Sequence, residues 1–157
     1  MLAPRRARSF ALLAATSLAL LVGPLVEPAT AAASVSARYE ISAIAHTNTE
    51  RAQRDRAKLK KSKCLDRFAE KQARAMAASH IMYHQSMKPI LDKCRLSQVG
   101  ENVAFGYPSG KAVVKAWMHS PGHKGNLLNS RHRVIGLGAY QDSEGYWYVS
   151  QVLGRKV

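Results

Sequence analysis

The region that most constrains the fold runs from residue 99 to residue 129, where strand, turn and helix signals follow one another without a long break. Residues 99–105 are predicted to form a short β-strand that carries one acid, Glu101. Gly100 and Asn102 flank this acid and suit an irregular backbone, which makes an ordinary surface position for Glu101 less favoured.

Two helices are predicted after this strand. Ser109 suits the N-cap of a helix over residues 111–119. Ser120 can cap a second helix and Pro121 suits its first position, so His123 would lie in the first turn. A helix N-terminus disfavours a charged imidazole, and a neutral His123 could bind a metal or accept a proton. A ring that only hydrogen-bonds a backbone carbonyl is an equally good interpretation of this residue.

The chain before this region predicts two amphipathic helices. Apolar residues recur at helical spacing over residues 37–56, where Arg51 is assigned to the polar face, and over residues 64–79. The basic run at 54–63 is predicted to be a solvated helix end and loop, with a binding patch as the less favoured alternative. Residues 89–94 are expected to form another loop, because they begin with proline and are rich in charge.

The chain ends with two predicted strands, residues 134–140 and 146–153, joined by a hairpin turn over residues 142–145. Gly136 and Gly138 share one face of the first strand and would let another element approach the sheet closely. Helices followed by pairing strands predict an α+β domain, and apolar residues on both faces of the sheet predict helices on both sides.

The N-terminal residues have the layout of a secretory signal. A basic start precedes an uncharged apolar run, and small residues near 29–33 suit a signal-peptidase cut. The apolar run is shorter than the roughly 20 residues that a membrane-spanning helix needs. We therefore expect residues 1–33 to be removed and residues 34–157 to form one secreted domain with no transmembrane segment.

The chain has a formal net charge of +14 and two cysteines. In an exported protein such a charge favours anionic envelope polymers or lipid headgroups as partners, and the absence of alternating aromatic and basic residues argues against nucleic acid. In an oxidising compartment an even pair of cysteines usually forms a disulfide, so Cys64 and Cys94 are expected to be bonded. A catalytic thiol is disfavoured, because neither cysteine lies in an activating motif.

His80 and His84 stand four residues apart, as in the helix of zinc proteases. That motif needs a glutamate directly after the first histidine, and Ile81 stands there instead. The pair therefore does not predict a protease of that class.

Four segments together resemble bacterial members of the CAP superfamily, which includes cysteine-rich secretory proteins, antigen-five proteins and plant pathogenesis-related proteins. They read GENVAFG, AWMHSPGHKGNLLN, IGLGAY and WYVSQVLG. Asn48 and Arg51 resemble the N-x-x-R signature of the family's first helix. The resemblance implies a three-layer α-β-α sandwich around a central antiparallel sheet.

The resemblance also implies a central cleft with two histidines and two acids. His84 and His123 match the histidines, which in this family can hold a divalent metal such as zinc, and Glu101 matches the first acid. The second acid is missing, because Ser120 follows His119 where the family pattern has a carboxylate. Asn102, His119 and Ser120 are expected to support the cleft, with His119 either as a third imidazole or pointing to solvent.

Three functions remain as hypotheses. The favoured one is a non-enzymatic extracellular module that binds a lipid, a sterol-like molecule or an envelope polymer. The second is a metal-dependent hydrolase of envelope material, with His84 and His123 as zinc ligands and Glu101 as the candidate catalytic base. The third is a structural or stress-related secreted domain without a ligand.

Overall fold

A computed structural model describes residues 28–157, with side chains from Val35 onward. Residues 1–27, which contain most of the predicted secretory signal, lie outside the described residues, so that prediction stays untested. In the part that is described, each helix is too short or too polar to cross a bilayer.

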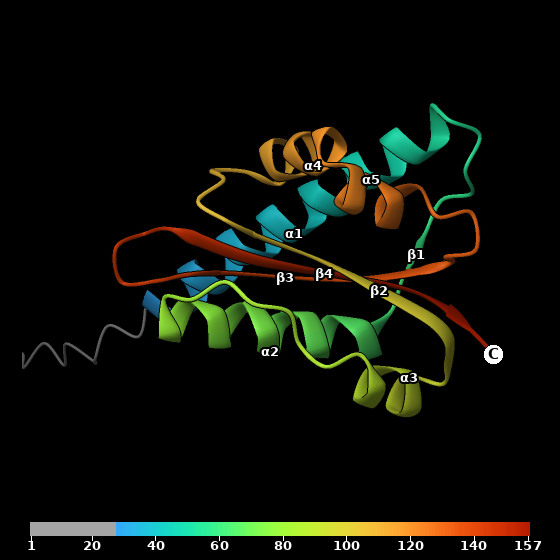
Figure 1. Cartoon of the computed structure of the whole chain (residues 1–157). Coiled ribbons are helices and arrows are strands. Elements are labelled where there is room, and N and C mark those ends of the chain that lie inside the picture. Colours follow the sequence, from blue (N-terminus) through green and yellow to red (C-terminus); the bar gives the residue numbers. More distant parts are fainter. Residues whose placement is uncertain (1–27) are drawn as a thin grey trace, which may run out of the picture.

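The domain is a three-layer sandwich, as the resemblance implies (Figure 1). Helices α1, α4 and α5 cover one face of the sheet, and α2 and α3 cover the other. The elements are α1 (Pro28–Ala52), β1 (Lys60–Lys61), α2 (Lys63–Ser79), α3 (Lys88–Cys94), β2 (Leu96–Phe105), α4 (Gly110–His119), α5 (Pro121–Leu128), β3 (Val134–Gln141) and β4 (Trp147–Lys156).

The strands lie in the order β1-β3-β4-β2, and β4 pairs antiparallel with both β2 and β3. The short β1 adds a parallel pairing at the edge, in a run that was expected to be a loop. Its cause is the preceding Leu59, which is buried against Ile135 and Leu153 and so draws the chain onto the sheet. The backbone N–H of Lys60 then donates to the carbonyl of Arg133 at 2.9 Å.

The two glycines of β3 have the role that the sequence indicates. A Cβ atom at Gly136 would overlap the backbone at Leu65, and one at Gly138 would overlap the backbone at Ala69 and Glu70. Helix α2 therefore packs directly on the β3 backbone, and this close approach fixes the distance between the helix layer and the sheet.

The segment around Pro89 is helical, and the expectation of a loop there was wrong. Proline lacks an N–H, but the first position of a helix does not need that donor, so Pro89 begins α3 and does not prevent it. Ile90 and Cys94 are buried and hold the helix against its neighbours.

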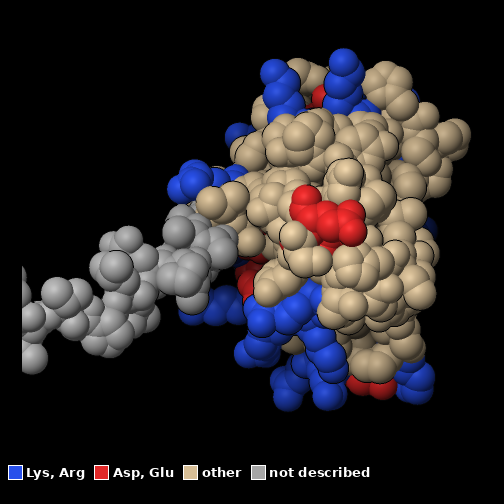
Figure 2. Space-filling model, turned by 90° about the vertical axis from the view of Figure 1, so that its left-hand side faces the viewer, with Lys and Arg blue, Asp and Glu red and all other residues tan. Residues whose placement is uncertain are grey.

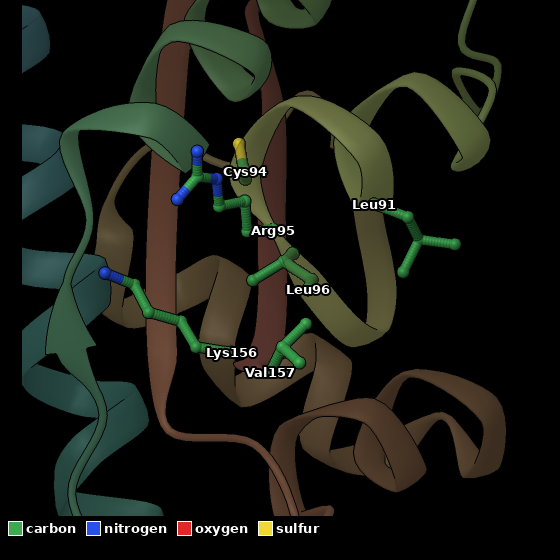
Figure 3. A pocket seen from close by; sticks show the side chains of 6 residues that line it. All are labelled: Leu91, Cys94, Arg95, Leu96, Lys156 and Val157. Carbon is green, nitrogen blue, oxygen red and sulfur yellow. The ribbon is translucent and has the colours of Figure 1, made fainter.

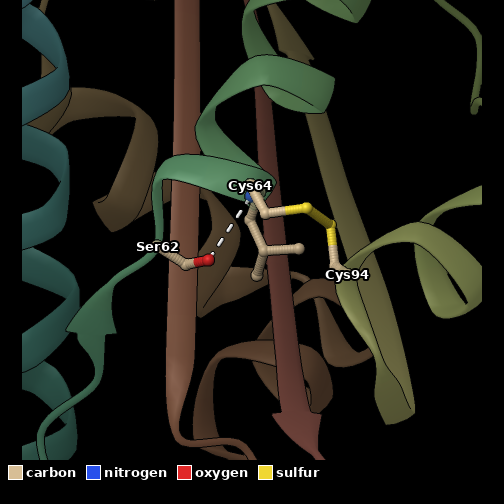
Figure 4. Close-up of a disulfide and its surroundings, with 4 residues drawn as sticks. Ser62, Cys64 and Cys94 are labelled. Atoms are coloured by element: carbon tan, nitrogen blue, oxygen red, sulfur yellow. Dashed lines mark hydrogen bonds between the residues drawn. A yellow bond between two sulfur atoms is a disulfide. The ribbon is translucent and has the colours of Figure 1, made fainter.

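Cys64 and Cys94 form the expected disulfide, which joins the first turn of α2 to the last turn of α3 (Figure 4). The Ser62 side chain caps α2 by accepting a hydrogen bond from the N–H of Leu65 at 3.5 Å. With a sequence separation of 30 between the cysteines, closing this loop stabilises the fold by about 3–4 kcal/mol in the chain-entropy model.

Candidate functional site

Glu101 is the centre of the candidate site and its side chain is 2% exposed. It lies in the middle of β2, and both carboxylate oxygens accept hydrogen bonds. Oε1 accepts from Gln85 Nε2 at 2.7 Å and from Ser150 Oγ at 2.8 Å. Oε2 accepts from His84 Nδ1 at 2.8 Å and from the backbone N–H of Gln85 at 3.2 Å. Burial of this acid is therefore offset by four donors from two other segments.

His84 lies in the segment between α2 and α3, and its side chain is 57% exposed. Because a carboxylate oxygen is an acceptor, the contact with Glu101 assigns the proton to Nδ1 of His84. In the neutral ring Nε2 then carries the lone pair, and the contact with the buried carboxylate holds the ring in place.

His123 lies in the first turn of α5 and is half-buried, as the Ser-Pro-Gly-His pattern predicts. Burial lowers the pKa of the His123 imidazole, and the charge of His84 lowers it further. The effect of His84 on this pKa indicates that the two predicted histidines lie within range of each other's charge, with His84 held against the Glu101 side chain and the His123 carbonyl against Asn102. Ser120 occupies the N-cap position, but it caps with its backbone carbonyl, which accepts from Lys124 N at 2.8 Å, and not with its side chain.

A buried chain of amides fixes α5 to the sheet. Asn102 Nδ2 donates to Gln151 Oε1 at 3.0 Å and to the His123 carbonyl at 3.3 Å. Asn126 Nδ2 donates to Asn102 Oδ1 at 3.0 Å, and Gln151 Nε2 donates to Thr47 Oγ1 at 2.9 Å. Asn102, Gln151 and Thr47 have no exposed surface. Asn102 therefore ties the His123 backbone to the sheet.

His119 is not part of this arrangement. Its ring is exposed, and Nδ1 lies 2.7 Å from the carbonyl of Lys115, one turn earlier in α4. The sequence left two orientations open for the His119 side chain, and the structure shows the one that points to solvent.

Sequence reasoning missed Gln85, Ser150 and Gln151. Their signal was present, because Ser150 and Gln151 are polar residues inside a strand that is otherwise apolar. A polar side chain in a buried strand needs a partner, and here the partners are Glu101 and Asn102.

This geometry limits which metal the site could hold. Residues 28–157 contain no cluster of three or more His, Cys, Asp or Glu side chains that could hold a metal. Since both oxygens of Glu101 are engaged, the side chains left to hold a metal would be the imidazoles of His84 and His123, with the carboxylate of Glu101 as the partner that orients His84. This set fits an exchangeable cation that keeps several waters, and it does not fit a closed structural zinc site.

Comparison with known proteins agrees with this architecture. The chain is 33% identical over 132 residues to the uncharacterized protein YkwD of Bacillus subtilis, which covers 80% of this chain and 50% of YkwD. An extracellular protein containing an SCP domain from Bacillus anthracis has a similar structure, with a TM-score of 0.74, 22% identity, and coverage of 85% of this chain and 45% of that one. The structure of NaASP2 with Zn²⁺ matches with a TM-score of 0.56 and 14% identity, over 78% of this chain and 82% of that one.

The chain thus spans about half the length of YkwD and less than half of the Bacillus anthracis protein. The family model for the cysteine-rich secretory protein family, CAP, matches residues 44–153, which include every element from the end of α1 to β4. The chain belongs to the CAP family of cysteine-rich secretory proteins.

Proposed function

We propose that the protein is a non-enzymatic extracellular binding module in which His84 and His123 hold a divalent cation such as zinc. The observation that carries this proposal is the 2.8 Å contact between His84 Nδ1 and the buried carboxylate of Glu101. Metal-binding histidines are commonly oriented in this way, by a carboxylate on the ring nitrogen that does not bind the metal. The relative NaASP2, whose structure was determined with Zn²⁺, supports the choice of metal.

The proposed site has two protein ligands, so water would complete the coordination shell. A bound cation would supply positive charge and exchangeable positions to an anionic group of a ligand. His84 is more than half exposed, which gives such a group access to the cleft from solvent. The lowered pKa of His123 favours binding, because a metal then competes less with a proton for the imidazole.

The engaged state of Glu101 supports a non-enzymatic role. A general base needs a free lone pair directed at a proton, and both oxygens of Glu101 accept hydrogen bonds from protein donors. The second family carboxylate is replaced by Ser120. A hydrolase that uses Glu101 as base is the alternative, and it requires Glu101→Gln to abolish turnover while the fold is retained.

The location and the partner class are part of the proposal. The Bacillus anthracis relative is described as extracellular, and the strongly positive net charge favours an anionic lipid or envelope polymer as the partner. A structural or stress-related domain without a ligand is the remaining alternative.

Native mass spectrometry of the secreted protein, purified without chelator and then titrated with zinc, tests the proposal. We expect one zinc ion to bind the wild type and the His119→Ala control. We expect His84→Ala and His123→Ala to lose at least tenfold in affinity, because each removes one of two ligands. Equal zinc binding by all four proteins would overturn the proposal, and so would an absence of zinc binding by the wild type.

A further inference from the structure

One end of the molecule gathers positive charge from segments that are far apart in the sequence. The connection between α1 and α2, residues 53–63, contains six Lys or Arg residues and one acid. Figure 1 shows this connection and the C-terminus at the same end of the sheet, opposite the β3–β4 turn.

The sheet aligns three cations, Lys60, Arg133 and Arg155, on neighbouring strands. Lys60 N donates to the Arg133 carbonyl at 2.9 Å, and Arg133 N donates to the Gly154 carbonyl at 2.8 Å. Val134 pairs with Gly154, so Arg133 and Arg155 stand opposite each other just beyond that pair. Since neighbouring strands are about 4.8 Å apart, the backbones of Lys60, Arg133 and Arg155 form a row about 10 Å long.

A buried arginine fixes the two loops that carry much of this charge. Arg51 was assigned to the polar face of its helix, but it has no exposed surface. Its guanidinium donates to the carbonyls of Ala57 at 2.8 Å, Leu127 at 2.6 Å and Asn129 at 3.0 Å. Burial lowers the pKa of Arg51, and the charges of Arg133 and Arg56 lower it further, which places all three cations close together.

We define the basic end by six exposed side chains that have no carboxylate within 4.0 Å in the described part of the chain. They are Lys58, Lys60, Arg131, Arg133, Arg155 and Lys156. By contrast, the nearby Lys61 lies 3.6 Å from Asp66 and Arg54 forms an ion pair with Glu50. The charge of the basic end is thus not compensated within the fold.

The surroundings of the basic end indicate a hydrophilic partner. Among residues 35–157, the large exposed apolar side chains other than Val157 lie elsewhere, in the 81–83 segment, around the β3–β4 turn and on α1. Figure 2 shows the β3–β4 end of the molecule, where Asp or Glu at the centre is bordered above and to the right by residues of neither charge, with Lys and Arg below and at the top. Apart from Val157, the basic end therefore lacks the large exposed apolar side chains that enter a membrane, and it lacks the aromatic rings that stack on bases.

The cationic surface continues to the rim of a pocket of about 580 Å³ between α3 and the end of β4. In Figure 3 the side chains of Arg95 and Lys156 point away from Leu91, on the far side of this pocket. Three of the six side chains of the basic end are arginines, and the planar guanidinium matches the oxygens of a phosphate better than an ammonium does.

We propose that the basic end binds a linear polymer with closely spaced phosphate groups, at a surface separate from the His84–His123 cleft. This inference extends the proposed binding function to a named partner chemistry and does not require the cleft to hold a metal. Several cations contact one polymer, so binding releases many counterions and weakens steeply with salt.

Calorimetric titration with inorganic polyphosphate, at NaCl concentrations from about 50 to 200 mM, tests the proposal. The variant Lys60→Gln/Arg133→Gln/Arg155→Gln removes the row of cations. The variant Lys58→Gln/Arg131→Gln/Lys156→Gln removes the other three, whose side chains make no hydrogen bond or ion pair within the described chain. The control Lys71→Gln/Lys111→Gln/Lys115→Gln removes the same charge from exposed positions on α2 and α4.

We expect both basic-end variants to lose about tenfold or more in affinity and to reduce the slope of log K against log salt by about 2. The control should keep at least half of the wild-type affinity, and His84→Ala/His123→Ala should bind polyphosphate normally even if zinc binding is lost or was never present. Equal losses in the basic-end and control variants would overturn the proposal in favour of net charge alone. Binding to phosphatidylglycerol vesicles without binding to polyphosphate would overturn it in favour of a membrane surface.

Discussion

Glu40 on α1 accepts a hydrogen bond from the backbone N–H of Ala139 at 3.2 Å, and this contact covers the outer edge of β3. Because β1 is only two residues long, the outward N–H groups further along β3 have no strand partner. Asp66 on α2 covers a second outward N–H group of β3, because its carboxylate accepts a hydrogen bond from Leu137 N at 3.3 Å. Carboxylates from both helix layers thus protect the open part of this edge from pairing with another chain.

The ionisation of Glu40 makes stability depend on pH, and the hydrogen bond from Ala139 opposes part of the shift in the pKa of Glu40. Burial raises the pKa of Glu40 to about 7, from 4.5, and the charge of Glu70 contributes. The folded state therefore binds the proton more tightly, and stability falls as pH rises from about 4.5 to 7. Glu40→Gln keeps an oxygen for Ala139 without the charge. We expect it to raise the free energy of unfolding at pH 8 by about 1–2 kcal/mol, allowing for partial exposure, and to leave it almost unchanged at pH 4.

Urea unfolding of both proteins at pH 4 and pH 8 measures this difference. Glu50→Gln is the matched control, because it removes the same charge from the same helix at a surface pair with Arg54. A gain for Glu40→Gln that is the same at both pH values would show that ionisation of Glu40 is not its cause.

The second prediction concerns the contact between α2 and the sheet. Gly138→Ala places a methyl group where the backbone of Ala69 and Glu70 lies, so the helix must move or the strand must distort. We expect a loss of about 2–3 kcal/mol, seen as a lower midpoint in urea. Gly125→Ala is the control, since its Cβ would meet nothing within 4 Å and alanine favours the α5 helix. A Gly138→Ala protein as stable as the Gly125→Ala protein would refute the close packing.

The sequence predicted these features because each has a local cause. Gly136 and Gly138 alternate in one strand, which is enough to predict a close approach of another element. His123 follows a serine and a proline that together begin a helix, so its place in the first turn was readable. The strands and the long helices followed from periodicity in the same way.

The parts that were missed depend on contacts between distant segments. Arg51 looks like a surface residue of an amphipathic helix, but the carbonyls that surround it come from residues 57, 127, 129 and 132. Strand β1 has two residues, too few for any pattern, and it forms because Leu59 is buried. Likewise, nothing near Glu101 in the sequence indicates that Gln85 and Ser150 will hold its carboxylate.

The third prediction tests the amide chain behind His123. Asn102→Ala leaves Gln151 Oε1 without its donor and frees the His123 carbonyl. We expect a stability loss of about 2–3 kcal/mol, together with shifted ring signals of His123 in NMR spectra of the metal-free protein. The ring signals of His119, which lies outside the chain of amides, should stay in place. Unchanged His123 signals would mean that Asn102 stabilises the fold without positioning the histidine.

The last prediction concerns His132, which is 1% exposed. Its Nδ1 lies 3.2 Å from the carbonyl of Asn126 and so carries the proton, while Nε2 has no hydrogen-bond partner among the described residues. Burial lowers the pKa of His132, the contact with the Asn126 carbonyl opposes this, and the charge of Arg51 lowers the pKa further. The folded state thus binds the proton more weakly than the unfolded chain, so stability is lost as pH falls below about 6.5.

We expect His132→Gln to reduce this loss of stability at acid pH. The glutamine amide N–H can still donate to the Asn126 carbonyl, and glutamine does not take up a proton. At pH 8 the variant should be less stable than the wild type by about 1–2 kcal/mol, since the ring packs better than an amide, and the difference should shrink steadily towards pH 5. Thermal unfolding across this range measures the trend, with the exposed His119→Gln as the control. A difference that stays constant from pH 8 to pH 5 would show that His132 is not a source of acid sensitivity.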